Sequence, residues 1–326
     1  MANIEYAYGL TPVIYNVLLI ITNNCNLQCK YCIYYTNVNN SEKYYLTPAI
    51  INNFMPIYLN IINSSNLFDI IISGGEPTLS PYFLDIVDLC SQAPRVNSII
   101  ILSNGAPDPS LFIKAKNIIN KKNKLLSICM SIHESQLQNI ENYVDKINYL
   151  LDSNINVSPR VVINTKNITE NMLLYLQLNN IKISPLFGSD VTNLQDMTDI
   201  NLHNSKNKLL IHYDDDSEEI CSLYDVTIQK HNPFKGYYCT SLYQNITIDE
   251  KGYIFPSCFT TKKYFCWSNF QTRHLNRIMK QHMKCSRDMC ECYNKPIRYK
   301  DIKLLPYLIN KQKEDIIKYG YNQNTL

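Results

Sequence analysis

The chain has 326 residues, of which 45% are hydrophobic and only 8 are glycine, so fibrous and disordered classes are excluded. Its 12 cysteines are not accompanied by an N-terminal export signal, and no apolar run reaches about 18 residues. We therefore expect a cytoplasmic protein of one or two domains, with no membrane association, whose cysteines serve as metal ligands rather than disulfides.

The formal net charge of +3 is unevenly distributed. Residues 262–326 hold 14 Lys or Arg and 5 Asp or Glu, whereas residues 1–261 hold 17 and 23. A basic C-terminal end suits either an anionic partner, such as an acidic peptide, or a plain solvated surface. Nucleic acid is not favoured, because no nucleic-acid motif accompanies the charge.

The first two thirds of the chain alternate between two kinds of segment, after a short lead-in at residues 1–14. Uniformly apolar runs, too short for amphipathic helices, predict buried parallel strands. We expect these strands at residues 15–21, 68–73, 97–103, 125–132, 156–164 and 181–187. Segments with helical spacing lie between them, at residues 47–63, 81–92, 109–120, 137–153 and 169–179. This alternation predicts an α/β fold with a parallel sheet, but does not distinguish a doubly wound sheet from an open barrel.

The last third is less regular. The acidic run 214–219 is interpreted as a solvated turn between short strands, and residues 244–248 and 253–255 flank a turn at 249–252 that predicts a hairpin. Residues 272–326 are predicted to be mostly helix and basic coil.

Three cysteines, Cys25, Cys29 and Cys32, follow the first predicted strand in one short loop. Three soft thiolates at this spacing can hold three corners of a cubane iron–sulfur cluster and leave the fourth iron open. A structural zinc site would need a fourth ligand nearby, and the neighbouring residues offer none.

Residues 22–32, including the aromatic Tyr31 before the last cysteine, resemble the cluster loop of radical S-adenosylmethionine (SAM) enzymes. The resemblance implies a partial (β/α)6 TIM-like barrel with its chemistry at the C-terminal ends of the strands. It also implies a [4Fe-4S] cluster whose open iron chelates SAM, and a 5′-deoxyadenosyl radical that abstracts hydrogen from a substrate.

A second motif, Gly74-Gly75-Glu76-Pro77, follows the second predicted strand. Adjacent glycines let the backbone approach a ligand closely at a strand end. The motif resembles the GGEP motif of the same family, which implies that Gly74, Gly75 and Glu76 hold the SAM amino group.

Later strand ends carry further matches, each with a simpler structural alternative. Ser103 and Asn104 resemble a family turn near SAM, or form a plain turn. Ser131 resembles a ribose-binding residue, or is an ordinary polar residue. Arg160 would pair with the SAM carboxylate and Asn164 would support it, or Arg160 forms a structural ion pair.

The remaining cysteines fall into two groups. Cys90 and Cys129 lie in apolar segments and are expected in the core. A C-terminal group resembles the auxiliary-cluster region of SPASM and twitch domains, which implies one auxiliary Fe–S cluster. Its proposed ligands are Cys239, Cys258, Cys285, Cys290 and Cys292. Zinc bound by some of these thiolates is the alternative, with Cys221 or Cys266 as substitute ligands.

The expected organisation is a radical SAM partial barrel at 1–205, a smaller cysteine-rich SPASM/twitch-like domain at 206–300 and a tail at 301–326. The resemblance implies an enzyme acting on a peptide or small protein. A small-molecule dehydrogenase and a non-catalytic cluster-binding sensor are the alternatives. Expected partners are an electron donor such as a flavodoxin or ferredoxin and a separate peptide-recognition protein. The sequence assigns no general acid or base, although His133 lies near a strand end.

Overall fold

The computed structural model of the chain describes residues 3–10, 15–29, 32, 42–62, 66–133, 136, 139–163, 184–187, 208–221, 233–256, 265–266, 283–285 and 297–319. The predicted helix at 169–179 lies outside these residues, as do Tyr31, Asn164, Cys258, Cys290 and Cys292.

The six predicted parallel strands form the larger part of the main sheet, which has nine strands among the described residues. They are β2 (Tyr15–Ile20), β3 (Phe68–Ser73), β4 (Val96–Ser103), β5 (Leu125–Ile132), β6 (Asn156–Ile163) and β7 (Ser184–Phe187). Their order in the sheet follows their order in the chain. Right-handed crossovers between strands in this order place every connecting helix on the same face. The structure thereby excludes the doubly wound alternative, which would put helices on both faces.

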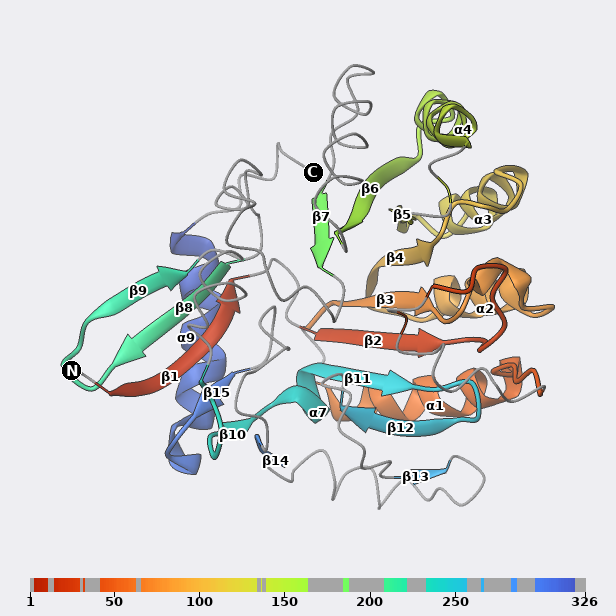
Figure 1. Cartoon of the computed structure of the whole chain (residues 1–326). Helices are drawn as coiled ribbons and strands as arrows, with labels where there is room; N and C mark the ends of the chain where they lie inside the picture. The colour runs from red at the N-terminus through yellow and green to blue at the C-terminus, as the bar shows by residue number, and fades with distance from the viewer. Residues whose placement is uncertain are drawn as a thin grey trace.

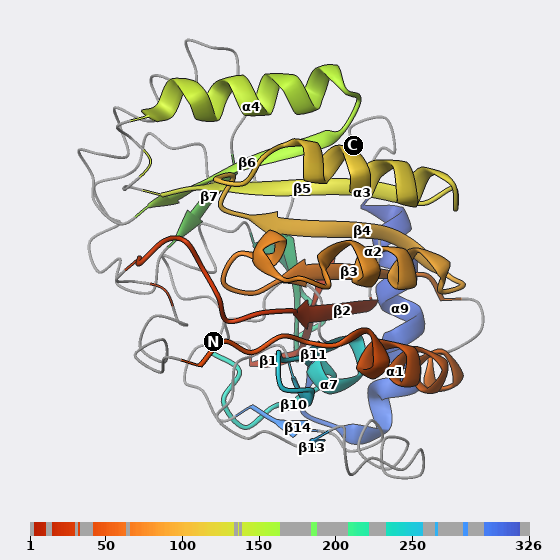
Figure 2. The ribbon, with the colours of Figure 1, turned by 90° about the vertical axis from the view of Figure 1, so that its right-hand side faces the viewer.

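Four helices cover that face, as Figures 1 and 2 show. They are α1 (Pro48–Ile61), α2 (Phe83–Gln92), α3 (Ser110–Asn120) and α4 (Ile140–Asp152). Alternate strand residues such as Val17, Ile70 and Ile99 pack with Phe54 and Ile147 of the helices in one buried core. Among the described helices, none is both long and apolar enough to span a membrane.

The predicted hairpin is present and extends the main sheet. It consists of β11 (Asn245–Ile248) and β12 (Tyr253–Pro256), with Gly252 in the left-handed region at φ +80°. Strand β11 pairs in parallel with β2, and β13 (Phe265–Cys266) pairs with β12. The strand that leads into the cysteine loop therefore has neighbours on both sides.

A second sheet brings together segments from both ends of the chain (Figure 1). Its order is β14 (Met283–Lys284), β10 (Tyr238–Cys239), β15 (Arg298–Tyr299), β1 (Ile4–Leu10), β8 (Lys208–Tyr213) and β9 (Glu218–Cys221). The prediction of a mere lead-in at residues 1–14 was wrong. Tyr6, Tyr8 and Leu10 alternate along β1 and are buried on one face. Residues 214–217 of the acidic run form the predicted turn between β8 and β9, whereas Glu218 and Glu219 belong to β9 itself.

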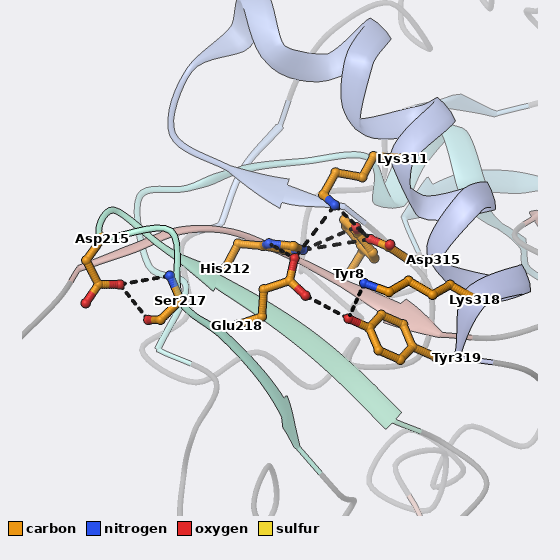
Figure 3. Close-up of polar contacts among 9 residues, drawn as sticks. All are labelled: Tyr8, His212, Asp215, Ser217, Glu218, Lys311, Asp315, Lys318 and Tyr319. Atoms are coloured by element: carbon orange, nitrogen blue, oxygen red, sulfur yellow. Dashed lines mark hydrogen bonds and ion pairs between the residues drawn. The ribbon is translucent and has the colours of Figure 1, made fainter.

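The short helix η7 (Ile302–Leu304) and helix α9 (Leu305–Lys318) follow β15, and a polar network joins α9 to the second sheet (Figure 3). Tyr8 donates a hydrogen bond to Asp315 on α9, and Lys311 lies 3.3 Å from the same carboxylate. His212 Nδ1 lies 3.0 Å from Glu218 Oε1. Burial lowers the pKa of His212, while the carboxylates of Glu218 and Asp315 oppose that shift. At least one basic residue of the C-terminal end, Lys311, therefore stabilises the packing of α9 on the second sheet.

A second, fully buried contact fixes the same helix. Gln312 on α9 donates to the backbone oxygen of Gly9 at 3.0 Å and accepts from Gln244 Nε2 at 2.9 Å. Gln244 ends the short helix α7 (Ser241–Gln244), directly before β11. Gln312 thus connects the second sheet to the segment that completes the main sheet.

Replacing Gln312 by Leu should destabilise the protein, because Gln244 Nε2 and the Gly9 oxygen would lose their partner. Each unsatisfied buried group costs about 1–3 kcal/mol. Chemical denaturation monitored by circular dichroism should show that loss in the free energy of unfolding. Glu314→Leu, at an exposed position of the same helix, is the control and should change stability by less than about 0.5 kcal/mol. Equal stability of the two variants would contradict this role for Gln312.

Candidate functional site

The cysteine loop leaves the C-terminal end of β2 and is paired directly with the Gly-Gly-Glu segment. Ile21 N donates to Ser73 O at 2.8 Å, Gly75 N to Thr22 O at 2.8 Å, and Glu76 N to Asn24 O at 2.8 Å. These bonds continue the parallel pairing of β2 and β3 past the end of both strands. The backbone that precedes Cys25 is therefore held in a fixed position.

The two glycines are required by this close approach. A Cβ atom on Gly74 would lie less than 3.0 Å from Thr22 O, and one on Gly75 less than 3.0 Å from Asn24 O. Gly74 also has a positive φ of +149°, which side chains disfavour. The sequence interpretation attributed this closeness to a bound ligand. The structure shows the backbone of the cysteine loop as the close neighbour.

The other side of the same loop is fixed by the chain that returns to α1. Asn23 Nδ2 donates to Glu42 O at 3.0 Å, and Tyr44 N donates to Asn23 Oδ1 at 2.7 Å. Leu46 N donates to Ile21 O at 2.9 Å. The start of the loop is thus held from both sides, which restricts the positions that the first thiol can take.

Glu76 is fully buried and connects the ends of β3 and β4. Its carboxylate accepts hydrogen bonds from Asn104 N at 2.8 Å, from Ser103 Oγ at 3.0 and 3.1 Å, and from Thr78 Oγ1 at 2.6 Å. Thr78 belongs to the short helix η2 (Pro77–Leu79). Burial raises the pKa of Glu76, and these donors act in the opposite direction. Contact of Glu76 with the SAM amino group stays a prediction.

Asn104 reaches from the end of β4 to the cysteine loop. Its side-chain nitrogen donates to Asn26 Oδ1 at 2.8 Å and lies 3.7 Å from Cys25 Sγ. Lys146 of α4 holds the turn that follows, donating to the backbone oxygens of residues 105, 106 and 107 at 2.8–3.2 Å. The Asn-Gly turn is therefore part of the support of the loop.

Ser131 and His133 form a further link to the loop from the end of β5. Ser131 Oγ donates to Ser103 O at 3.1 Å and lies 3.0 Å from His133 Nε2. The other ring nitrogen, Nδ1, lies 3.6 Å from Cys29 Sγ. Burial lowers the pKa of His133 to about 4. Sequence patterns could not reveal this contact, because Cys29 and His133 are far apart in the chain and meet only when the strands pair.

Arg160 lies beside Ser131 on the neighbouring strand β6, in direct register. Strand periodicity places Arg160 on the face of the sheet away from the helices. On that face Leu18, Ile71 and Ile100 are only half-buried, unlike the fully buried residues of the helix-covered face. A cation and several aliphatic side chains thus share the face that the described helices leave uncovered.

The three thiols have the chemistry that an iron–sulfur cluster needs. All three are half-buried and lie outside any disulfide. Burial raises the pKa of Cys25, and the nearby thiols of Cys32 and Cys29 raise it further. Among the described residues, no group of three or more His, Cys, Asp or Glu side chains is close enough together to bind a single metal ion. A cubane puts each thiolate on a different iron, so its ligands are spaced more widely than those of one ion. The donor set fits a cluster.

Two of the C-terminal cysteines share one face of the second sheet. Cys239 pairs with Met283 and Tyr238 with Lys284, so Cys285, two residues beyond Met283, is the diagonal neighbour of Cys239. Cys221 lies on β9, four strand spacings or about 19 Å from β10. Cys221 is thus too distant to share a cluster with Cys239.

The other cysteines within the described residues lie outside the second sheet, apart from Cys221 on β9. Cys90 and Cys129 are buried in the main domain, and burial raises the pKa of both thiols, as expected for core residues. Cys266 belongs to β13, at the edge of the main sheet rather than in the second sheet.

Comparison with known proteins agrees with this arrangement. Residues 19–158, from β2 into β6, match the family described as the radical SAM superfamily. The match covers less than half of the chain; it supports the radical SAM superfamily and indicates an enzyme.

The curated relatives match a shorter stretch of the chain. GTP 3′,8-cyclase of Pasteurella multocida (strain Pm70) is 34% identical over 92 residues, which are 28% of this chain and 26% of the relative. GTP 3′,8-cyclase of Syntrophomonas wolfei subsp. wolfei is 28% identical over 85 residues, 26% of this chain and 25% of the relative. The chain therefore matches about a quarter of the length of these relatives.

Solved structures show a likeness of fold over a longer stretch. Native anSMEcpe with bound AdoMet has a TM-score of 0.53 at 14% identity and covers 80% of each chain. A polyhistidine-tagged form of anSMEcpe with bound AdoMet has a TM-score of 0.54 at 15% identity and covers 80% of this chain and 79% of that one.

Replacing Gly75 by Ala should displace the cysteine loop, because the new methyl group would overlap the backbone of Asn24. We expect most of the iron bound by the first cluster to be lost after anaerobic reconstitution. Gly236→Ala is the control, since no atom lies within 4 Å of its added Cβ and only the positive φ is unfavourable. Full iron loading of Gly75→Ala would show that the loop does not need this close pairing.

Proposed function

We propose that this protein is a radical SAM enzyme in which Cys25, Cys29 and Cys32 hold a [4Fe-4S] cluster. The observation that carries the proposal is the direct backbone pairing of the cysteine loop with Gly74-Gly75-Glu76 at the C-terminal ends of adjacent strands. When bound, the cluster and SAM would supply a 5′-deoxyadenosyl radical that removes a hydrogen atom from a substrate. The chain's own task is then to bind, orient and protect these groups.

The residues around the loop divide that task. The backbone nitrogen of Glu76 and the side chain of Asn104 fix the loop from the neighbouring strands through hydrogen bonds to Asn24 and Asn26. Arg160 provides a positive charge for the SAM carboxylate, and its half-buried position would strengthen that attraction relative to bulk water. Tyr31 and Asn164 would complete the SAM site. The half-buried aliphatic residues on the open face would limit access of water to the radical.

The open main sheet supports the proposal that the main domain is a partial (β/α)6 barrel. Six parallel strands in chain order, with helices on one face, are the arrangement that such a barrel requires. We place the barrel at residues 1–205, although β1 lies in the second sheet. The smaller domain at 206–300 and the tail at 301–326 would follow it.

We further propose one auxiliary Fe–S cluster in a SPASM/twitch-like domain. Cys239 and Cys285 share one face of the second sheet, and Cys258, Cys290 and Cys292 would supply the other ligands. Arg298 is fully buried, and on β15 it pairs directly with Cys239 of the neighbouring strand β10. A buried guanidinium is stabilised by nearby negative charge, which a thiolate-ligated cluster provides. Zinc bound by the same thiolates is the alternative.

The substrate we favour is a peptide or small protein, as the SPASM/twitch resemblance implies. A small-molecule substrate is the second candidate, and the match to relatives named GTP 3′,8-cyclase favours it. Either reaction would need an electron donor such as a flavodoxin or ferredoxin. A peptide substrate would also call for a separate recognition protein.

Incubation of the reconstituted protein with SAM and dithionite tests the proposed activity. We expect 5′-deoxyadenosine to form, as measured by chromatography and mass spectrometry, and the Cys29→Ala variant to form none. A fully iron-loaded protein that forms no 5′-deoxyadenosine would favour the non-catalytic sensor.

Iron counting tests the second cluster. Replacing Cys25, Cys29 and Cys32 together by Ala should leave about four irons per chain, and adding Cys239→Ala and Cys285→Ala should remove them. Cys90→Ala, in the core, is the control and should leave the iron content unchanged. Zinc in place of iron in the triple variant would support the alternative, and the absence of both metals would contradict a second site.

A further inference from the structure

The end of β5 provides a polar chain that leads to one cluster thiol. It runs from Ser103 O through Ser131 Oγ and the ring of His133 to Cys29 Sγ, with separations of 3.1, 3.0 and 3.6 Å. His133 is half-buried, and its backbone nitrogen donates to Gln136 Oε1 at 3.0 Å. The imidazole is therefore oriented by contacts on both its backbone and its ring.

We propose that His133 is a positioning residue for the cluster, donating a hydrogen bond from Nδ1 to the Cys29 thiolate. This inference rests on the proposed function, because Cys29 becomes a thiolate only as a cluster ligand. A thiolate accepts hydrogen bonds and cannot donate them, so the nitrogen that faces it must carry a proton.

Ser131 allows the His133 proton to lie on Nδ1 without any movement of non-hydrogen atoms. A hydroxyl group both donates and accepts, and its hydrogen rotates to suit its partners. With a protonated Cys29 thiol, the Ser131 hydroxyl can donate to Ser103 O and accept from His133 Nε2. With the thiolate, the same hydroxyl can turn and donate to Nε2 in place of Ser103 O, which leaves the ring proton on Nδ1. Ser131 would then act through His133 rather than on the SAM ribose.

The expected consequence is a change in the reduction potential of the cluster. Hydrogen bonds to the sulfurs of an Fe–S cluster stabilise its reduced form, which carries more negative charge. The bond from His133 should make the cluster easier to reduce. This matters for a protein that must pass an electron to SAM.

Two substitutions at position 133 distinguish the role of Nδ1 from the role of Nε2. His133→Asn keeps an amide nitrogen near the place of Nδ1, whereas His133→Gln places its amide near Nε2 and removes the donor to Cys29. We expect an EPR redox titration without SAM to give a more negative potential for His133→Gln and a potential near that of the unmodified protein for His133→Asn. Ser131→Ala should shift the potential in the same direction as His133→Gln, by a smaller amount. The cluster with the open iron is recognised by the change that SAM causes in its EPR spectrum.

Pulsed EPR on protein labelled with ¹⁵N-histidine gives a second, independent readout. A weak ¹⁵N coupling to the reduced cluster should be present and should disappear in His133→Gln. An unchanged potential together with an unchanged coupling in an iron-loaded His133→Gln variant would overturn the inference alone. If both variants lose iron equally, His133 is merely structural and the inference is also overturned. An unmodified protein without a SAM-responsive cluster would overturn the proposed function as well.

Discussion

The continuation of the β2–β3 pairing into the loops that follow is the interaction on which the site depends. Parallel strands normally separate where their loops begin, yet here Thr22 and Asn24 accept hydrogen bonds from Gly75 and Glu76. Only glycine fits at positions 74 and 75, because any side chain would overlap the carbonyl groups of the cysteine loop. The position of the first thiol is therefore set by main-chain bonds, which are less variable than side-chain contacts.

Polar side chains connect this fixed pair of loops to the ends of the next two strands, β4 and β5. The Glu76 carboxylate joins β3 to β4, Asn104 joins β4 to the cysteine loop, and Ser131 joins β5 to β4. Glu76, Ser103 and Asn104 are buried and share these hydrogen bonds, so loss of one link would weaken the next. The strand ends thus behave as one connected unit, and not as independent loops on a common scaffold.

Much of this could be predicted from the sequence, because the relevant signals are local. Uniform apolar runs identified the six parallel strands, and Gly252 marked the hairpin. Strand β1 was missed although Tyr6, Tyr8 and Leu10 alternate along it, because its partners β8 and β15 are remote in the chain and so short an alternation does not show what it pairs with. The contact between His133 and Cys29 was missed for the same reason. The roles of Gly74 and Gly75 were partly misread, since a glycine pair does not reveal which neighbour approaches it.

The placement of β11 beside β2 has a consequence for biosynthesis. During translation the ribosome releases β2 and the cysteine loop early, but residues 245–248, which cover the free edge of β2, emerge only after three quarters of the chain. Until then a hydrophobic strand presents unpaired amide and carbonyl groups, a state that favours association with other chains. The edge of the strand that leads into the cysteine loop is therefore covered only after residues 245–248 have been made, and a chain terminated before residue 245 would leave that edge open.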